Sequence, residues 1–446
     1  MGGLFGTDGV RGVANVELTA ELAVRLGRAL ARQQHERASV RPRMAIGRDP
    51  RPSSPMLQAA MTAGFCAGGG DVVPLGVLPT PGVAYATGWL GADVGTVISA
   101  SHNPVADNGI KVFGRDGFKL DDADEQRVEQ LLDRPHDQPP TGTAVGTTQP
   151  QPAAVAAYVD HLVAAADGDP SGLRVVVDCA DGAASEIASA ALARLGCDVT
   201  AIHADVNAQT VNVGCGSTHP EVVAAAVVEQ GADLGLSLDG DADRLIAVDH
   251  TGAVVDGDQI LAVLALRHQR CHGLEAVVTT VMTNLGFAQA MDAAGIRVIR
   301  TKVGDRHVLR AMLDGGHPLG GEQSGHLIIT DHATTGDGVL TAVRLLSAVA
   351  EAGVSLCELV AGVPRLPQVL VNVRGVDRDA LETAEPLWTE VARVEQELGA
   401  TGRVLLRASG TEPLVRVMVE ADREDRAQGW ADSLAEVVRR ELPGPA

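Results

Sequence analysis

The stretch Val94-Gly95-Thr96-Val97-Ile98-Ser99-Ala100-Ser101-His102-Asn103-Pro104 decides how the N-terminal part of the chain folds. Its first five residues form an apolar run that predicts a buried strand. Asn103-Pro104 then breaks the chain, which leaves Ser101 on a sharp turn directly after that strand. A serine in such a position has an exposed, fixed hydroxyl, as a nucleophile requires. Taken alone, the stretch is more often a surface turn, so the assignment of Ser101 depends on the rest of the chain.

Strand-like and helix-like segments alternate on both sides of this stretch, with clear helical spacing of apolar residues over 55–68. Such alternation predicts stacked α/β domains in which helices cover the sheets. From residue 369 the pattern changes to a strand, a long helix over 380–398, two strands and a helix, which is typical of a smaller α+β domain. We predict α/β domains with mixed sheets over 1–150, 151–252 and 253–366, a linker over 134–152, and a C-terminal α+β domain over 367–446.

The composition excludes several classes of function. The 446 residues carry a net charge of −21 and only 2% aromatic residues, whereas a general nucleic-acid binder is basic and stacks bases on aromatic side chains. We therefore expect no nucleic-acid partner. No apolar run is long enough to span a bilayer, no signal peptide is recognisable, and none of the six cysteines has CxxC spacing. These features predict a cytoplasmic protein with reduced thiols and no membrane contact.

The sharpest chemical motif is Asp239-Gly240-Asp241-Ala242-Asp243-Arg244, which follows a predicted strand over 234–238. Alternate carboxylates separated by small residues can turn toward one point, and hard oxygen ligands select Mg²⁺ or a similar ion. A calcium-binding EF-hand loop would need glycine and glutamate where the chain has Arg244 and His250. Arg244 is placed to reach a phosphoryl oxygen. A solvated acidic turn is the alternative.

A second motif after a predicted strand, Arg407-Ala408-Ser409-Gly410-Thr411-Glu412-Pro413, has the composition of an anion site. Small residues let backbone N–H groups approach an anion, hydroxyl groups add donors, and Arg407 supplies a bidentate fork. Arg416 adds a second positive charge. The P-loop pattern of nucleotide-binding proteins is absent. An ordinary turn between two strands is the alternative.

A third motif, Gly320-Gly321-Glu322-Gln323-Ser324-Gly325-His326, precedes a predicted strand over 326–329. Its glutamate and serine, flanked by glycines, suit hydrogen bonds to sugar hydroxyls, although a plain turn is the alternative. Isolated basic residues in glycine- and aspartate-rich segments complete the set, and each alone is more often a surface charge. These residues are Arg11, Arg48, Arg51, Lys111, Lys302 and Arg306.

The four motifs together resemble the α-D-phosphohexomutase superfamily, and the resemblance covers nearly the whole chain. Ser101-His102-Asn103-Pro104 matches the family's phosphoserine loop, and the other three match its metal, sugar and phosphate loops in order. Each match alone is weak, whereas four at these separations are highly specific. Three segments look most like the bacterial phosphoglucosamine mutases: 4–12, 107–111 and above all Gln323, where phosphomannomutase and phosphoglucomutase relatives tend to have Met. Three places depart from the usual pattern without removing a charged or nucleophilic group: Val105-Ala106, His307 and Ala408.

The resemblance implies a fold, a reaction and a set of site residues. Three similar α/β domains and the smaller C-terminal domain would surround a central active-site cleft. Glucosamine 6-phosphate and glucosamine 1-phosphate would interconvert there through phosphoserine and glucosamine 1,6-bisphosphate, feeding UDP-N-acetylglucosamine and cell-wall synthesis. Glucosamine 1,6-bisphosphate or glucose 1,6-bisphosphate would be the activator. One Mg²⁺ per active site would bind Asp239, Asp241, Asp243 and the phosphate on Ser101.

The resemblance also assigns roles to the remaining site residues. Lys111 is the first candidate for the general base and His326 the second, with Arg244 and Arg11 beside the phosphoryl group. The residues expected to bind substrate are Lys302, Glu322, Ser324, Arg407, Ser409, Gly410, Thr411 and Arg416.

Other functions stay open at this point. A phosphoglucomutase or phosphomannomutase would use the same four loops and differ only in sugar-loop details such as Gln323. A phosphatase that works through phosphoserine would not need the sugar loop. A catalytically inactive binding or regulatory protein would need neither Ser101 nor three aspartates. The sequence also leaves the oligomeric state open, a homodimer included.

Overall fold

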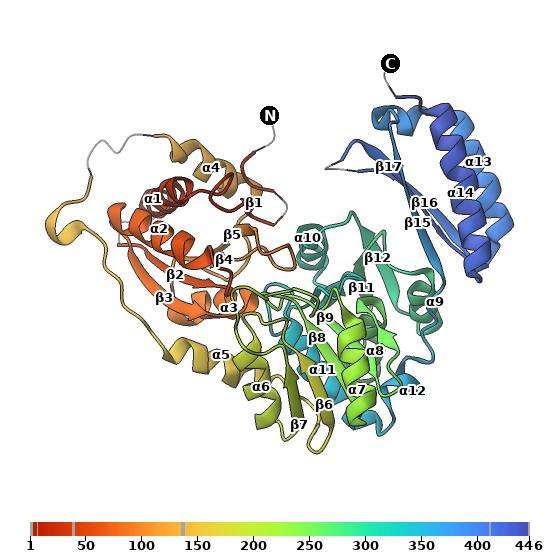
Figure 1. The fold of residues 1–446 in the computed structure, drawn as a ribbon, viewed down its shortest axis with the longest axis horizontal. Coiled ribbons are helices and arrows are strands. Elements are labelled where there is room, and N and C mark those ends of the chain that lie inside the picture. Colours follow the sequence, from red (N-terminus) through yellow and green to blue (C-terminus); the bar gives the residue numbers. More distant parts are fainter. Residues whose placement is uncertain (1–2, 7, 38–40, 135–138, 410–411, 445–446) are drawn as a thin grey trace. The chain divides into compact units, whose positions relative to one another are not determined.

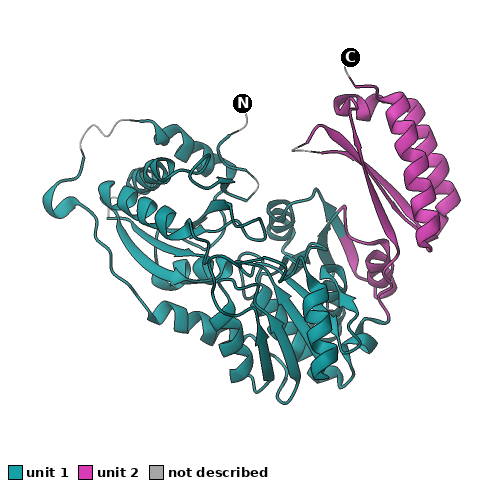
Figure 2. Cartoon of the chain, in the orientation of Figure 1, with its two compact units in different colours: residues 1–280, 299–361 teal, residues 281–298, 362–446 magenta. Residues whose placement is uncertain are grey.

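The computed structural model describes residues 3–6, 8–37, 41–134, 139–409 and 412–444 (Figure 1). Gly410 and Thr411, both predicted to bind phosphate, lie outside the described residues. The chain divides into two compact units (Figure 2). Unit 1 comprises residues 1–280 and 299–361, and unit 2 comprises residues 281–298 and 362–446.

The N-terminal part of unit 1 is a five-stranded mixed sheet covered by helices (Figure 1). Its elements are β1 (Val10–Val13), α1 (Ala20–Arg37), β2 (Arg43–Arg48), α2 (Ser54–Ala67), β3 (Asp71–Val77), α3 (Thr80–Leu90), β4 (Val94–Ile98), β5 (Asp107–Gly114) and α4 (Asp122–Leu132). β2 pairs in parallel with β3 and β4, whereas β5 pairs antiparallel with β4 and β1, which gives the order β1-β5-β4-β2-β3. Every residue of β4 is buried, as its apolar run predicts.

Two glycines let α1 and α2 cross at backbone contact. A Cβ atom on Gly64 would lie 2.1 Å from the carbonyl oxygen of Val24, and one on Gly27 would lie 2.4 Å from that of Met61. The helices therefore approach more closely than any side chain at these positions would allow. Among the described residues, the buried core beneath them consists of aliphatic residues, Met44, Met61 and one aromatic ring, that of Phe65.

The predicted linker over 134–152 lies against the sheet where it is described. The Val72 N–H donates to the carbonyl of Thr147 at 2.8 Å, and the Gln149 N–H donates to the carbonyl of Val72 at 2.9 Å. The segment thus continues the sheet beyond β3 because these hydrogen bonds satisfy backbone groups at its edge. The described part of the predicted linker is therefore bound to the edge of the first sheet.

The second part of unit 1 repeats the mixed α/β arrangement. Its elements are α5 (Ala153–Ala164), β6 (Arg174–Asp178), α6 (Ser185–Arg194), β7 (Asp198–Ile202), α7 (Pro220–Gln230), β8 (Leu234–Leu238), β9 (Leu245–Asp249) and β10 (Val254–Val255). The strand order is β10-β9-β8-β6-β7, with β6 parallel to β7 and β8, and β9 antiparallel to its neighbours. β8 and β9 are buried throughout, so the turn between them, which carries the three aspartates, is anchored at both ends.

A third sheet has the order β12-β11-β13-β14. The elements of this part are α8 (Gly257–His272), β11 (Ala276–Thr280), α9 (Leu285–Ala293), β12 (Arg297–Thr301), α10 (Asp305–Gly315), β13 (Leu319–Gly321), β14 (Leu327–Ile329), α11 (Gly338–Ala352) and α12 (Leu356–Val360). β13 runs parallel to β11 and antiparallel to β14, so the predicted sugar loop is a hairpin connection between β13 and β14.

The C-terminal part of unit 2 is an antiparallel sheet with two long helices (Figure 2). Its elements are β15 (Gln368–Arg374), the 3₁₀ helix η2 (Arg378–Thr383), α13 (Glu385–Leu398), β16 (Arg403–Ala408), β17 (Leu414–Glu420) and α14 (Glu424–Glu441). β17 lies between β15 and β16. The single helix predicted over 380–398 is wrong. Pro386 has no N–H to donate, so it is tolerated in the first turn of α13 but cannot continue a helix from η2.

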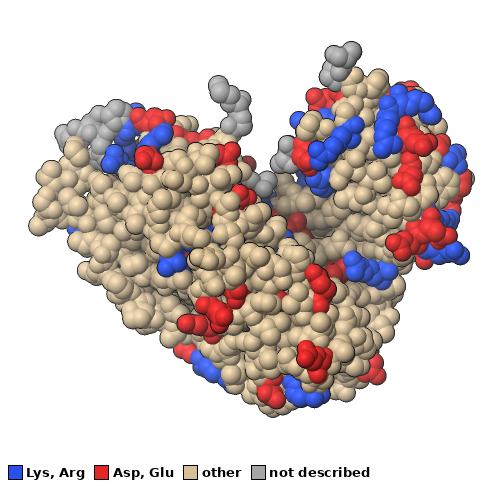
Figure 3. Space-filling view, in the orientation of Figure 1, with Lys and Arg blue, Asp and Glu red and all other residues tan. Residues whose placement is uncertain are grey.

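Acidic and basic side chains lie next to one another over α13 and α14 on the face drawn in Figure 3. Arg393 and Glu390, for example, form an ion pair of 2.5 Å along α13. No helix among the described residues is long and apolar enough to cross a membrane.

Candidate active site

Ser101 is fixed in place at the turn after β4. Its φ of +54° is rare for a residue with a side chain, and its N–H donates to Oγ of Ser99 at 2.9 Å. The Ser101 hydroxyl donates to Oδ2 of Asp239 at 2.5 Å. The predicted exposure of this hydroxyl is wrong, because Ser101 is fully buried beneath the aspartate loop.

A buried ion pair between Arg51 and Asp49 stabilises the turn that carries Ser101. Arg51 and Asp49 are both fully buried and pair at 2.8 Å, so the prediction of a surface charge for Arg51 is wrong. The turn bends several carbonyl groups away from the sheet, and buried carbonyls need donors. Arg51 donates to the carbonyls of Ser101 at 2.9 Å, Asn103 at 2.7 Å, Pro104 at 2.5 Å and Asp107 at 3.1 Å.

Three buried aspartates follow β8, and their side chains converge. One carboxylate oxygen from each of Asp239, Asp241 and Asp243 lies within 4.8 Å of the others. Among the described residues, Oδ1 of Asp241 and Oδ1 of Asp243 are buried without a hydrogen-bond partner. Burial and the carboxylates of Asp243 and Asp241 raise the pKa of Asp239 to about 8. Unsatisfied buried oxygens and mutual repulsion are what a divalent cation relieves, so the residues fit the predicted Mg²⁺.

Lys111 lies among carboxylates on the strand β5. Its Nζ is 2.9 Å from Oδ2 of Asp241, 3.0 Å from Oδ2 of Asp243 and 3.1 Å from Oδ2 of Asp8. Burial alone would lower the pKa of Lys111, but these three carboxylates hold it well above its usual value. The side chain is therefore an ammonium group that donates in this arrangement.

His326, Arg244 and Arg11 surround the same centre. Nδ1 of His326 lies 3.7 Å from Oδ1 of Asp243, and its Nε2 accepts a hydrogen bond from the Gly336 N–H at 3.1 Å. Nε of Arg244 lies 3.7 Å from the same Asp243 oxygen. Arg11 donates to Oδ1 of Asn103 at 3.2 Å, within the serine turn. The structure thus brings together Ser101, the three aspartates and the four basic residues predicted to lie near the serine. These four are Arg11, Lys111, Arg244 and His326.

The predicted sugar loop is held in place by hydrogen bonds of two of its side chains. Oε1 of Glu322 accepts from the Gly304 N–H at 3.0 Å, and Ser324 is exposed. The Gln323 amide donates to Oδ2 of Asp256 at 3.4 Å, which caps the N-terminus of α8. Lys302 is exposed at the end of β12. Glu322 and Ser324 therefore remain the side chains of the loop that can meet a sugar, whereas Gln323 supports the loop.

The predicted phosphate loop belongs to unit 2. Arg407 on β16 faces Arg416 on β17 directly across the sheet. Burial and then the charge of Arg416 lower the pKa of Arg407. Among the described residues, Nε of Arg407 and Nε of Arg416 are buried without a hydrogen-bond partner. Two adjacent guanidinium groups with unused donors suit a doubly charged anion. Oγ of Ser409 accepts from the Glu412 N–H at 3.2 Å, within the same turn.

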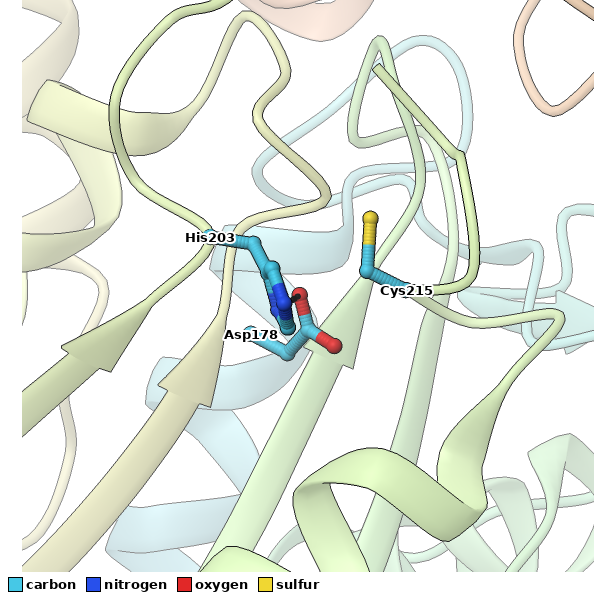
Figure 4. Close-up of side chains that lie close together, drawn as sticks. All are labelled: Asp178, His203 and Cys215. Atoms are coloured by element: carbon cyan, nitrogen blue, oxygen red, sulfur yellow. Dashed lines mark hydrogen bonds and ion pairs between the residues drawn. The ribbon is translucent and has the colours of Figure 1, made fainter. Parts of the chain in front are cut away.

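A second group of metal-ligating side chains, Asp178, His203 and Cys215, serves the fold (Figure 4). The His203 ring lies against the Asp178 carboxylate, and one ligand atom from each of the three residues, Sγ of Cys215 included, lies within 4.8 Å of the others. Asp178 already accepts from the N–H groups of Ala180 at 3.0 Å and Gly216 at 2.8 Å and faces Nδ1 of His203 at 3.2 Å. The bond from Gly216 fixes its loop to β6, and the Ser217 N–H donates to the carbonyl of Leu238, the last residue of β8 before the aspartate turn, at 2.8 Å.

Several residues at the centre were missed in the sequence. Oγ1 of Thr80 donates to Oδ2 of Asp241 at 2.5 Å, and the Asn212 amide donates to the Ser101 carbonyl at 2.9 Å. Neither residue lies in a recognisable motif. Asp8 lies in the glycine-rich segment around Arg11, which was a usable signal. Lys119 and Asp305, which pair with each other beside Asp8, carried none.

Comparison with known families matches the phosphoglucomutase/phosphomannomutase domains along the chain. The α/β/α domain I matches residues 2–138, domain II residues 156–252, domain III residues 256–366, and the C-terminal domain residues 370–437. Among solved structures, a phosphoglucomutase/phosphomannomutase family protein from Burkholderia thailandensis superposes with a TM-score of 0.83 at 24% identity, covering 99% of this chain and 100% of that one. An Aspergillus fumigatus N-acetylphosphoglucosamine mutase, solved with GlcNAc-6P and magnesium, gives a TM-score of 0.70 at 19% identity, covering 98% and 95%. These two likenesses show the fold.

Curated relatives are much closer in sequence. Phosphoglucosamine mutase from Frankia alni is 53% identical over 99% of both chains. The enzyme of the same name from Thermobifida fusca is 54% identical over 98% of both chains. That from Streptomyces coelicolor is 53% identical over 99% of this chain and 100% of its own. With all four domains matched and this identity over the full length, the chain belongs to the phosphoglucomutase/phosphomannomutase family, in its phosphoglucosamine mutase branch.

Proposed function

We propose that the chain interconverts glucosamine 6-phosphate and glucosamine 1-phosphate through phosphoserine at Ser101 and a glucosamine 1,6-bisphosphate intermediate. One observation carries the proposal: the Ser101 hydroxyl donates to Asp239 at 2.5 Å, beside two buried aspartate oxygens that have no hydrogen-bond partner among the described residues. A nucleophile and a cation site in contact are what phosphoryl transfer needs. The 53% identity to phosphoglucosamine mutases supports the amino sugar as the substrate.

The reaction has two phosphoryl transfers of the same kind. In the first, the bond between phosphorus and Oγ of Ser101 breaks while a bond to the 1-hydroxyl oxygen of glucosamine 6-phosphate forms. The 1-hydroxyl proton passes to a base, and Oγ of Ser101 takes up a proton. The bisphosphate then turns round without leaving. In the second, the bond between phosphorus and the 6-oxygen breaks while a bond to Oγ of Ser101 forms. Oγ gives up its proton, the 6-oxygen takes one up, and glucosamine 1-phosphate is released. Free glucosamine 1,6-bisphosphate or glucose 1,6-bisphosphate would prime Ser101.

Asp239, Asp241 and Asp243 would hold Mg²⁺ together with an oxygen of the phosphate on Ser101. The ion supplies positive charge that stabilises the phosphoryl group during transfer. Arg244 lies beside the same aspartates and Arg11 beside the serine turn, so both guanidinium groups can neutralise phosphoryl oxygens.

Lys111 is our first candidate for the general base, and His326 is the second. Two of the three carboxylates that hold the proton on Lys111 belong to Asp241 and Asp243. When these oxygens bind a cation they no longer favour the charged lysine, so its pKa falls toward the range of a base. In neutral His326 the proton is on Nδ1, because Nε2 accepts from the Gly336 N–H, so Nε2 would have to give up this hydrogen bond before the ring could take a proton.

The other parts of the substrate have separate partners in this proposal. Glu322 and Ser324 bind ring hydroxyls, and Lys302 supports the sugar phosphate. Arg407, Ser409 and Arg416 bind the phosphate that is not being transferred, with Gly410 and Thr411 from the same loop.

The test is a coupled assay with Mg²⁺ and a trace of glucose 1,6-bisphosphate, comparing glucosamine 6-phosphate, glucose 6-phosphate and mannose 6-phosphate. A preference for glucosamine 6-phosphate, lost in Ser101→Ala, is expected. A preference for glucose or mannose phosphate would keep the mechanism and overturn the substrate. Phosphate release in excess of isomerisation would indicate a phosphatase, and no turnover of any sugar would point to a binding protein.

A further inference from the structure

Lysine is rare in this chain. Of the 36 basic Lys and Arg residues, only Lys111, Lys119 and Lys302 are lysines. An ammonium group is a compact point charge, whereas a guanidinium group is a broad planar fork, so the two are not interchangeable in a confined site. Lys111 and Lys302 already have proposed roles in the reaction. Lys119 has none, although it lies in the same unit as the serine and the aspartates.

Lys119 lies between two carboxylates. Its Nζ pairs with Oδ1 of Asp8 on one side and with Oδ2 of Asp305 on the other. The three side chains are only 9%, 21% and 14% exposed. Burial alone would lower the pKa of Lys119, but Asp305 and Asp8 raise it above its usual value, so the side chain is charged. The Leu120 N–H donates to the Val112 carbonyl at 3.2 Å, which fixes this segment to β5.

The Asp8 side of this bridge leads to the groups around Ser101. Oδ2 of Asp8 lies 3.1 Å from Nζ of Lys111, and the same oxygen pairs with Arg11. Asp8 therefore holds the candidate base and an arginine of the serine turn at once. Its position depends on Lys119, which is bonded to its other oxygen.

The Asp305 side leads to the sugar loop. Asp305 is the first residue of α10, and the preceding residue, Gly304, donates its N–H to Glu322 at 3.0 Å. Asp305 also lies 3.7 Å from Nε2 of His326. A second ion pair between the same two parts, Arg306 with Asp122 at 2.6 Å, holds α10 beside α4.

We propose that Lys119 is a positioning residue that links the position of the sugar loop to the positions of Lys111 and Arg11. It does so by holding Asp8 of one domain and Asp305 of another at fixed positions relative to each other. The inference rests on the proposed function. It explains how the side chains that bind the sugar keep a fixed position relative to those that act on the phosphoryl group. Without the ammonium group, Asp8 and Asp305 repel each other. Lys111 and Arg11 then lose their alignment with Glu322.

The test is a double-mutant cycle between Lys119→Met and Glu322→Gln, measured as kcat/KM on whichever hexose phosphate the wild type turns over fastest. We expect Lys119→Met to lower kcat/KM at least about tenfold. In the double variant, the fold-decrease in kcat/KM should be at least about fivefold smaller than the product of the fold-decreases in the two single variants. The reason is that the two substitutions break the same linkage. A purely structural role of Lys119 would leave the two losses multiplicative, within about twofold of their product.

Asp305→Asn is the second variant, used in the same cycle in case Lys119→Met does not fold. This substitution removes the ion pair between Lys119 and Asp305, and it leaves no unpaired buried carboxylate on α10. Arg310→Met is the matched control, because it removes an exposed cation from the same helix, and its kcat/KM should stay within about twofold of the wild type. An active wild type with multiplicative losses in both cycles would overturn the inference alone. A wild type that turns over no hexose phosphate would refute the proposed function, and this inference with it.

Discussion

Ser101 and Asp239 are joined by a 2.5 Å hydrogen bond from the serine hydroxyl to Oδ2, although 138 positions separate them in the chain. The bond connects the turn after β4 with the turn after β8, so it joins the first two sheets at their strand ends. Ser101, the proposed nucleophile, is fully buried because the neighbouring domain covers it and supplies Asp239 as its carboxylate partner.

Ser101→Ala should abolish the proposed mutase activity, with kcat lower by about 10⁴-fold or more, because alanine has no side-chain oxygen to carry the phosphoryl group. The assay is conversion of glucosamine 6-phosphate, with intact mass to follow the loss of phosphate from the enzyme. Ser171→Ala, an exposed serine, is the control and should behave as the wild type. Retained turnover in Ser101→Ala would contradict the phosphoserine route.

Asp241→Asn should weaken Mg²⁺ binding by roughly 10- to 100-fold, because it replaces a charged ligand and removes one of three converging carboxylates. Titration calorimetry with Mg²⁺ measures this without turnover, and chelation of the metal should abolish activity in the wild type. Asp160→Asn, on an exposed aspartate, serves as control. Equal affinity in Asp241→Asn and wild type would rule out this aspartate as a ligand.

Arg407→Gln should raise KM for glucosamine 6-phosphate by about 10- to 100-fold with a smaller change in kcat, because a charge-assisted phosphate contact contributes about 1.5–3 kcal/mol. Steady-state kinetics give both constants. The exposed Arg423→Gln is the matched control. An unchanged KM would show that the paired guanidinium groups of β16 and β17 do not bind substrate.

Gly64→Ala should destabilise the protein by about 1–3 kcal/mol, although alanine favours helices, because its Cβ would lie 2.1 Å from the Val24 carbonyl oxygen. Gly88→Ala on α3 is the matched control, since nothing lies within 4 Å of its added Cβ. That variant should be neutral or slightly stabilised. Thermal unfolding distinguishes the two, and equal melting temperatures would contradict the close crossing of α1 and α2.

Asp337→Asn should change how stability depends on pH. Burial raises the pKa of Asp337 to about 6, although hydrogen bonds from the Leu340 N–H and the Tyr158 hydroxyl lower it in part. The folded state therefore holds this proton more tightly than the unfolded state does. The resulting stabilisation is complete below about pH 4 and is lost as pH rises through about 6.

Relative to the neutral asparagine, wild-type stability should thus fall by up to roughly 3 kcal/mol between pH 4 and pH 7. Asparagine is as good an N-cap as aspartate, so α11 should keep its start. Urea unfolding at several pH values measures the difference, with the exposed cap variant Asp377→Asn as reference. A difference that does not vary with pH would contradict a protonated Asp337.

Local pattern was enough to predict much of this protein. The strand predicted over 234–238 is β8, and the helical spacing of apolar residues over 55–68 corresponds to α2 (Ser54–Ala67), because such patterns act within a few residues. The order of four loops, each beside a strand, also follows from the sequence. The ligands that these loops prefer can also be predicted from the sequence. Three carboxylates favour a cation and paired arginines favour an anion in any fold.

The tertiary structure alone decided which charges meet. Arg51 looked like a surface charge and is fully buried, because only the folded turn presents it with four carbonyl groups. Lys119 gains its role from Asp8 and Asp305, which lie 111 and 186 positions away. Such pairings depend on which sheet edges pack together, and that choice is set by burial over whole domains. A charged side chain carries no local signal of the partner it will find.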